Sequence, residues 1–192
     1  MTTIFNRDIL TMVIKMNEKM LKTISEPIKN FRLPKFEEIP DVGLYLEQTT
    51  KYISQIYAPV QEITLTSSMI SNYVKKGLIP NPVKKQYNRE QIAYLIFIAS
   101  AKLVLSMDFI NTLLNIQKKT YSAKSAYNYF CDELENMLKI TFGLEAEMYE
   151  IDDNKTKYPE IKGLLRTAIA NIANKIYLEK CFLYYNNNEI IE

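Results

Sequence analysis

Apolar residues recur at steps of three and four along most of the chain, which is the spacing of one face of an α-helix. Near the start, this pattern predicts a helix over 6–26, capped by Asn6 and ended by Pro27. Its apolar face consists of Ile9, Val13, Met16, Met20 and Ile24. This helix either packs on its own domain or offers that face to a partner chain. Its mixed charges disfavour a membrane surface.

Two more helices follow before the middle of the chain. One is expected over about 42–57, with Asp41 as its N-cap. The next is short. It begins at Thr66 or Ser67 as N-cap, and Gly77 suits the left-handed position after its end.

This short helix has two distinct faces. Ile70, Tyr73 and Val74 form an apolar edge that is expected to face the core. The opposite face is polar and consists of Ser68, Ser71, Asn72 and Lys75. Small hydroxyl groups, an amide and a lysine make a surface that can approach a partner closely and form hydrogen bonds.

The most apolar part of the chain predicts a buried helix over 89–105, with Asn88 and Gln91 forming a capping box at its start. Its apolar run is too short to span a membrane, which requires about 20 residues. Ser106 caps another short helix over 106–115. The chain then continues into a C-terminal region with helical patterns over 123–140 and 160–184.

These patterns predict an all-α fold. The chain has only four glycines and seven prolines in 192 residues, so long helices are favoured over many strands joined by tight turns. Any strand is expected within 79–88, as a short hairpin. We divide the chain into an N-terminal helix (1–30), a middle domain (31–115) and a C-terminal helical region (116–192).

Composition removes several chemistries. The chain has no histidine, so catalytic triads and histidine-ligated metals are excluded. Cys131 and Cys181 have no metal-binding spacing and are expected to be buried thiols in a reducing compartment. The acidic cluster within 143–159 is best explained as a solvated loop and helix face. We therefore expect a cytoplasmic protein with no catalytic residue, metal or cofactor.

Charge is unevenly distributed. The whole chain has a formal net charge of +2, yet the stretch 66–90 has no acidic residue before Glu90. Its cations are Lys75, Lys76, Lys84, Lys85 and Arg89. A local excess of positive charge favours an anionic partner such as nucleic acid, although a solvated lysine-rich connection between helices would give the same pattern.

The stretch MISNYVKKGLIP…YNREQIAYLIFIASAKLVLSMDFINTLL resembles the DNA-binding region of MerR-type regulators. Together with LPKFEEIPDVGLYLEQ, it resembles more closely an uncharacterised bacterial domain-of-unknown-function family, over about 6–185, that is itself regarded as MerR-like. Tyr73, Gly77, Leu78, Tyr87, Asn88 and Ile92 match the MerR-like pattern. Ser71 and Asn72 replace the arginine and first tyrosine that are usual in MerR proteins. The segment that would be the wing, 79–87, is also shorter than in those proteins.

The resemblance implies a MerR-like winged helix-turn-helix that binds double-stranded DNA and regulates transcription. The recognition helix would be about 67–76 and the basic wing about 79–88. The candidate DNA-binding residues are Ser67, Ser68, Ser71, Asn72, Lys75, Lys76, Lys84, Lys85, Tyr87 and Arg89. Two alternatives stay open: a helical protein-interaction module that keeps the fold without DNA binding, and an enzyme, for which no nucleophile–base pair can be named.

Symmetric regulators commonly pair two DNA half-sites, so a homodimer is expected. The apolar stripe within 161–184 is the preferred partner surface, although it could equally be used up inside one protomer. Its residues are Leu164, Ala168, Ala170, Ile172, Ala173 and Ile176. The sequence also leaves room for a small-molecule effector without identifying one.

Overall fold

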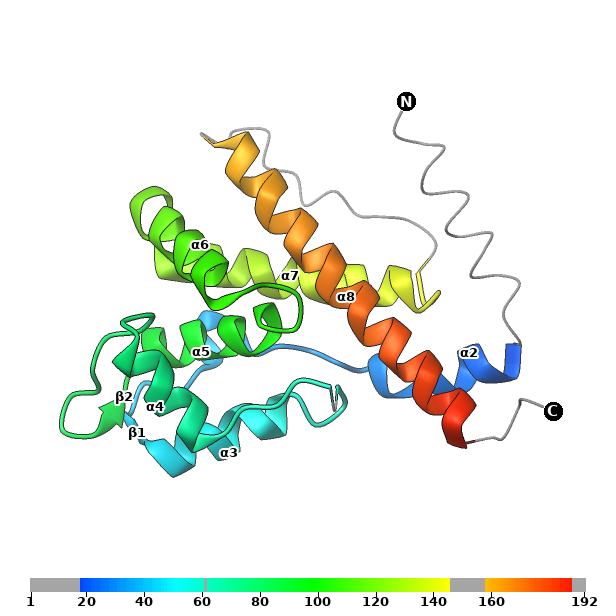
Figure 1. Cartoon of the computed structure of the whole chain (residues 1–192), viewed down its shortest axis with the longest axis horizontal. Helices are drawn as coiled ribbons and strands as arrows, with labels where there is room; N and C mark the ends of the chain where they lie inside the picture. Colours follow the sequence, from blue (N-terminus) through cyan, green and yellow to red (C-terminus); the bar gives the residue numbers. More distant parts are fainter. Residues whose placement is uncertain (1–17, 61, 146–157, 188–192) are drawn as a thin grey trace.

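The computed structural model describes residues 18–60, 62–145 and 158–187 (Figure 1). Its elements, in chain order, are α2 (Glu18–Ser25), the 3₁₀ turns Glu26–Ile28 and Phe36–Glu38, β1 (Leu44–Tyr45), α3 (Leu46–Ile56), α4 (Ser67–Lys75), β2 (Gln86–Tyr87), α5 (Arg89–Ala101), α6 (Met107–Thr120), α7 (Ala123–Thr141) and α8 (Pro159–Asn187). The described part is mainly helical, which confirms the predicted fold class. Of the first predicted helix, only α2 falls within these residues.

Helix α5 forms the centre of the core. Because it is apolar on nearly all sides, it is stable only when other elements surround it. Ile92, Leu95 and Ile96 are fully buried, and α5 contacts α3, α7 and α8. The Tyr57 hydroxyl forms hydrogen bonds with polar groups inside this core. It donates to the carbonyl of Ile96 at 2.9 Å and lies 2.6 Å from the Ser100 hydroxyl.

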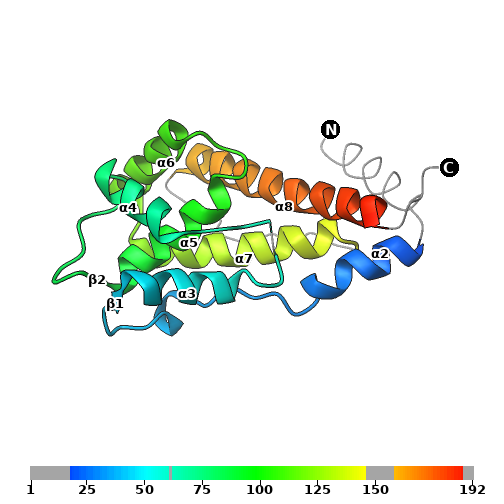
Figure 2. The same ribbon diagram turned by 60° about the horizontal axis from the view of Figure 1, so that its bottom comes forward.

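Helix α8 crosses α7 and reaches α2 at its C-terminal end (Figures 1 and 2). Ile172, Ala173 and Ile176 are fully buried within the protomer. Of the two expected uses of this stripe, these three side chains follow the second: they pack inside the protomer against α7 and are not free to contact a partner chain. Most of the stripe is instead part of the protomer's own core, whereas Leu164 is exposed.

The only sheet in the described part of the chain joins two segments distant in sequence. Leu44 pairs with Tyr87 and Tyr45 with Gln86, antiparallel. The prediction that strand structure is confined to 79–88 is therefore wrong for β1. Gly43 permits the approach, because a Cβ there would lie 2.7 Å from the Gln86 Cβ.

The same pairing shifts the start of α3. Since 44–45 are extended, the helix begins at Leu46 and not directly after Asp41 as predicted. The Gln48 side chain instead accepts a hydrogen bond from the Tyr45 amide at 2.9 Å. Farther along, helix α6 runs past the predicted domain boundary between 115 and 116. A single hydrophobic core includes residues from α2 through α8.

Candidate nucleic-acid interface

Both ends of α4 are fixed by local hydrogen bonds. At the start, the Thr66 hydroxyl accepts from the Met69 amide at 3.2 Å. At the end, Gly77 has a φ of 73°. The Leu78 amide donates to the Tyr73 carbonyl at 3.0 Å, and the Gly77 amide donates to the Val74 carbonyl at 2.9 Å. This is the predicted Schellman ending, and it sets where the chain leaves the helix.

The two faces of α4 are separated as predicted. Ile70 and Tyr73 are buried in the core. The exposed face presents Ser68, Ser71, Asn72 and Lys75, followed by Lys76. Of these, Ser71 donates its hydroxyl hydrogen to the Ser67 carbonyl at 2.9 Å, which leaves its oxygen able to accept.

Ser67 is placed differently from the other candidates. Its hydroxyl donates to the Glu47 carboxylate at 2.9 Å and lies 3.1 Å from the Thr50 hydroxyl. These contacts join the first turn of α4 to α3. Ser67 therefore holds the two helices together, and its side chain is only partly exposed.

At its tip, the loop 79–88 that follows α4 reverses direction through a two-residue turn formed by Lys84 and Lys85. Their φ angles are 50° and 65°, and the Gln86 amide donates to the Val83 carbonyl at 2.9 Å. Such turns normally use Asn-Gly, because residues with a Cβ are strained at positive φ by about 1 kcal/mol or more. Both lysines are exposed. We call this pair the tip lysines.

The base of the loop is held firmly. Ile79 is buried, and the Gln91 side chain donates to the Pro80 carbonyl at 2.9 Å. At the other end, β2 is bonded to β1. Strain at the tip is therefore supported by packing at the base, which is the condition under which strained turns persist.

Tyr87 and Arg89 do not join the exposed surface. Tyr87 is only 4% exposed, and burial raises the pKa of its hydroxyl. Arg89 donates through Nε to the Ile39 carbonyl at 2.9 Å, and its guanidinium lies 5.9 Å from the centre of the Phe36 ring. Both side chains therefore stabilise the fold near the candidate surface.

Four exposed lysines are clustered within the stretch 66–90, which has no acidic residue before Glu90, whereas other exposed lysines such as Lys22 and Lys119 lie apart from one another. Within the described residues, Lys75, Lys76 and the tip lysines make no ion pair. Some lysines elsewhere, such as Lys35, Lys124 and Lys139, each pair with a carboxylate. Figures 1 and 2 show α4, the following loop and β2 together at one end of the molecule. The site thus combines a polar helix face with uncompensated positive charge.

Outside this surface, the described part of the chain contains two cysteines and a number of acidic side chains. Among the described residues, cysteine and acidic side chains form no group of three that could hold a metal ion. Cys131 and Cys181 are free and buried, as predicted. Burial raises the pKa of the Cys131 thiol to about 12. Among the described helices, none is both long and apolar enough to cross a bilayer.

Comparison with known proteins gives a family but no relative of known function. No curated protein and no solved structure matches the chain. Residues 34–130, about half of the chain, match the family described as Domain of unknown function (DUF1836). This stretch is shorter than the 6–185 suggested by resemblance, but it contains α4, the tip lysines and all of α5 and α6. The chain therefore belongs to the DUF1836 family.

Proposed function

We propose that the chain is a DNA-binding transcriptional regulator with a MerR-like winged helix-turn-helix. In this assignment α3 and α4 form the helix pair, α4 enters the major groove, and the loop 79–88 is the wing. The observation that carries the proposal is the exposed polar face of α4 flanked by lysines without acidic partners in the described chain. Such a regulator acts in the cytoplasm of a bacterium.

The residues divide into two roles. Asn72 and Lys75 carry groups that can hydrogen-bond to base edges in the major groove, with Asn suited to adenine. The tip lysines, with Lys76, would neutralise phosphates and set the position of the module without reading sequence. The strained conformation of the tip lysines supports this role, because Asn-Gly would form the same turn with less strain but without charge.

The proposal is tested by a variant that removes charge without weakening the fold. Lys84→Asn/Lys85→Gly should stabilise the turn and weaken binding to all duplexes similarly. We expect the slope of log affinity against log salt to fall by about two units, one per lost phosphate contact. The measurement is fluorescence anisotropy with a genomic DNA pool over a salt series. In the matched control, Lys22→Ala/Lys119→Ala, two exposed lysines of α2 and α6 are removed.

Asn72→Ala should act differently, by changing sequence preference. Losing a bidentate adenine contact should cost about 1–3 kcal/mol at the affected base pair and little elsewhere. If the wild type fails to bind the DNA pool at low salt, the interaction-module alternative replaces the regulator. Equal loss of salt slope in the control double variant would also contradict the proposed surface.

A further inference from the structure

The small sheet beside α4 has one face toward the core and one toward solvent. Residues directly opposite each other in an antiparallel pair project to the same face of the sheet. Leu44 therefore shares one face with its partner Tyr87, and Tyr45 shares the other face with Gln86. Because Tyr87 is buried, the face with Leu44 is the inner one. The Tyr45 side chain lies on the outer face and is 51% exposed.

The tip of the loop 79–88 extends this outer face. Val83 forms an antiparallel bridge with Gln86, so its side chain lies on the same face as that of Gln86. Gln86 thus has Tyr45 on one side and Val83 on the other. Val83 is 72% exposed, and the tip lysines follow it directly in the chain. We call Tyr45, Gln86 and Val83 the outer face of the sheet.

The outer face also lies close to the start of α4. Tyr45 directly precedes α3, and in the first turn of α3 the Glu47 carboxylate accepts a hydrogen bond from the Ser67 hydroxyl at 2.9 Å. Figures 1 and 2 show β1, β2 and α4 at the same end of the molecule. In a helix-turn-helix, the first residues of the recognition helix are the ones that reach the bases. The outer face therefore connects the start of α4 with the tip lysines.

We propose that the outer face packs against the sugar–phosphate backbone of duplex DNA, with the Tyr45 hydroxyl donating to a phosphate. The inference rests on the proposed function and adds an uncharged contact to it. The hydrogen bond from Tyr45 to Gln48 uses the backbone amide of Tyr45, so it does not occupy the phenol hydroxyl. Tyrosine is among the side chains that donate to phosphate oxygens.

The charge beside the outer face decides which partner suits it. Exposed apolar side chains alone would fit a protein surface equally well. The tip lysines, however, adjoin Val83 and make no ion pair within the described residues. A DNA backbone presents anionic phosphates next to the apolar carbons of deoxyribose. It therefore matches lysines that flank a tyrosine ring and a valine.

The test separates this uncharged contact from the ionic ones, by fluorescence anisotropy with a genomic DNA pool over a salt series. Tyr45→Phe should weaken binding about fivefold, because it removes one hydrogen bond. Tyr45→Ala should weaken it at least about tenfold, because the packing of the ring is lost as well. Neither change should alter the slope of log affinity against log salt, since an uncharged side chain releases no counterion.

Leu164→Ala is the matched control, because it removes an exposed apolar side chain from α8. It should leave both affinity and salt slope unchanged. Urea denaturation shows whether each variant is folded, and Tyr45→Phe keeps the ring should Tyr45→Ala be unstable. A wild type that binds DNA no more tightly than a folded Tyr45→Phe would overturn the phosphate contact and leave the proposed function standing. A reduced salt slope in Tyr45→Phe would also overturn it, and a wild type that binds no DNA would overturn both proposals.

Discussion

Single residues at the ends of α4 determine where the candidate surface can form. Thr66 begins the helix with a side-chain hydrogen bond, and Gly77 ends it in a left-handed conformation. The direction of the chain after Gly77 then places Leu78 and Ile79 in the core and leaves the following residues to form the loop. A change at Gly77 should therefore affect both stability and the position of the tip lysines.

Gly77→Ala should lower the free energy of unfolding by about 1 kcal/mol, because its φ of 73° strains a residue with a Cβ. Nothing lies within 4 Å of the added Cβ, so the effect isolates backbone strain. Gly163→Ala is the matched control. It also meets no atom within 4 Å but lies in a helix, so it should raise stability by about 0.5–1 kcal/mol. Urea denaturation measures both, and changes of the same sign would contradict this account.

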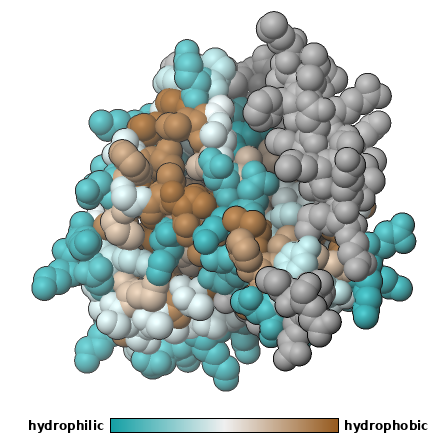
Figure 3. All heavy atoms as spheres, turned by 45° about the vertical axis from the view of Figure 1, so that its right-hand side comes forward, coloured by the Kyte–Doolittle hydropathy of each residue, from teal (hydrophilic) through white to brown (hydrophobic). Residues whose placement is uncertain are grey.

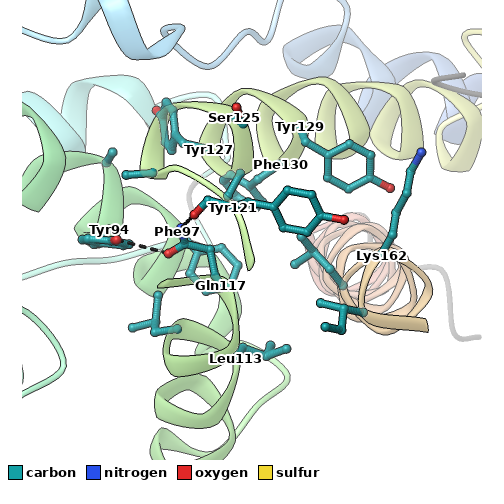
Figure 4. A pocket seen from close by; sticks show the side chains of 16 residues that line it. Tyr94, Phe97, Leu113, Gln117, Tyr121, Ser125, Tyr127, Tyr129, Phe130 and Lys162 are labelled. Atoms are coloured by element: carbon teal, nitrogen blue, oxygen red, sulfur yellow. Dashed lines mark hydrogen bonds between the residues drawn. The ribbon is translucent and has the colours of Figure 1, made fainter. Parts of the chain in front are cut away.

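Among the elements, α7 and α8 share a buried ion pair. Arg166 Nε donates to the Glu133 carboxylate at 2.7 Å, and the Glu133 side chain is only 1% exposed. A carboxylate this deeply buried needs its partner, because desolvation of an unpaired charge is costly. The pair therefore fixes how α8 is seated on α7, and with it the α8 wall of an apolar pocket that also has walls from α5, α6 and α7 (Figure 4).

Arg166→Met should reduce the free energy of unfolding by about 3 kcal/mol, since it leaves the Glu133 charge buried without its cation. In the control, Lys175→Met breaks the exposed pair with Glu179 on the same helix, which should cost less than about 0.5 kcal/mol. Thermal and chemical denaturation of both variants provide the measurement. Similar losses in the two would show that the burial of Glu133 is not the decisive factor.

For the molecule as a whole, α5 links the candidate DNA surface to an apolar pocket between α5, α6, α7 and α8. Its first turn holds the base of the loop through Gln91 and Pro80, and Phe97 lines the pocket farther along the same helix. The opposite end of the molecule exposes apolar side chains. These lie on α8 and include Leu178, Phe182, Leu183 and Tyr185. Figure 3, which brings the right-hand side of Figure 1 forward, shows apolar side chains gathered among polar ones on that face.

We expect a homodimer that uses this exposed part of α8, since two half-sites on DNA are best read by a symmetric pair. Phe182 is 59% exposed, and Phe182→Lys should yield monomers at micromolar concentration. Leu164→Lys is the control, because Leu164 is 52% exposed on the same helix but lies near its other end. Sedimentation equilibrium decides the matter. A monomeric wild type, or a Phe182→Lys dimer, would rule out this interface.

Local features were predictable from the sequence. The caps at Thr66, Asn88 and Ser106 agree with the structure because each depends on a hydrogen bond to a residue three positions away. The buried character of α5 followed from its composition, since a helix apolar on all sides has no stable exposed state. For the candidate site, the same local rules gave the boundaries of α4 and its polar face.

What the sequence by itself determined is thus the all-α class, most helix starts and the concentration of lysines in 66–90. Only the tertiary structure decided which surfaces meet. The pairing of Leu44 with Tyr87 and the contact of Arg89 with Ile39 join residues far apart in the chain. Ile172 shows the same limit, because helical periodicity identifies an apolar face but not the surface that covers it. The burial of Ile172 depends on how α8 packs on α7, so only the tertiary structure could establish it.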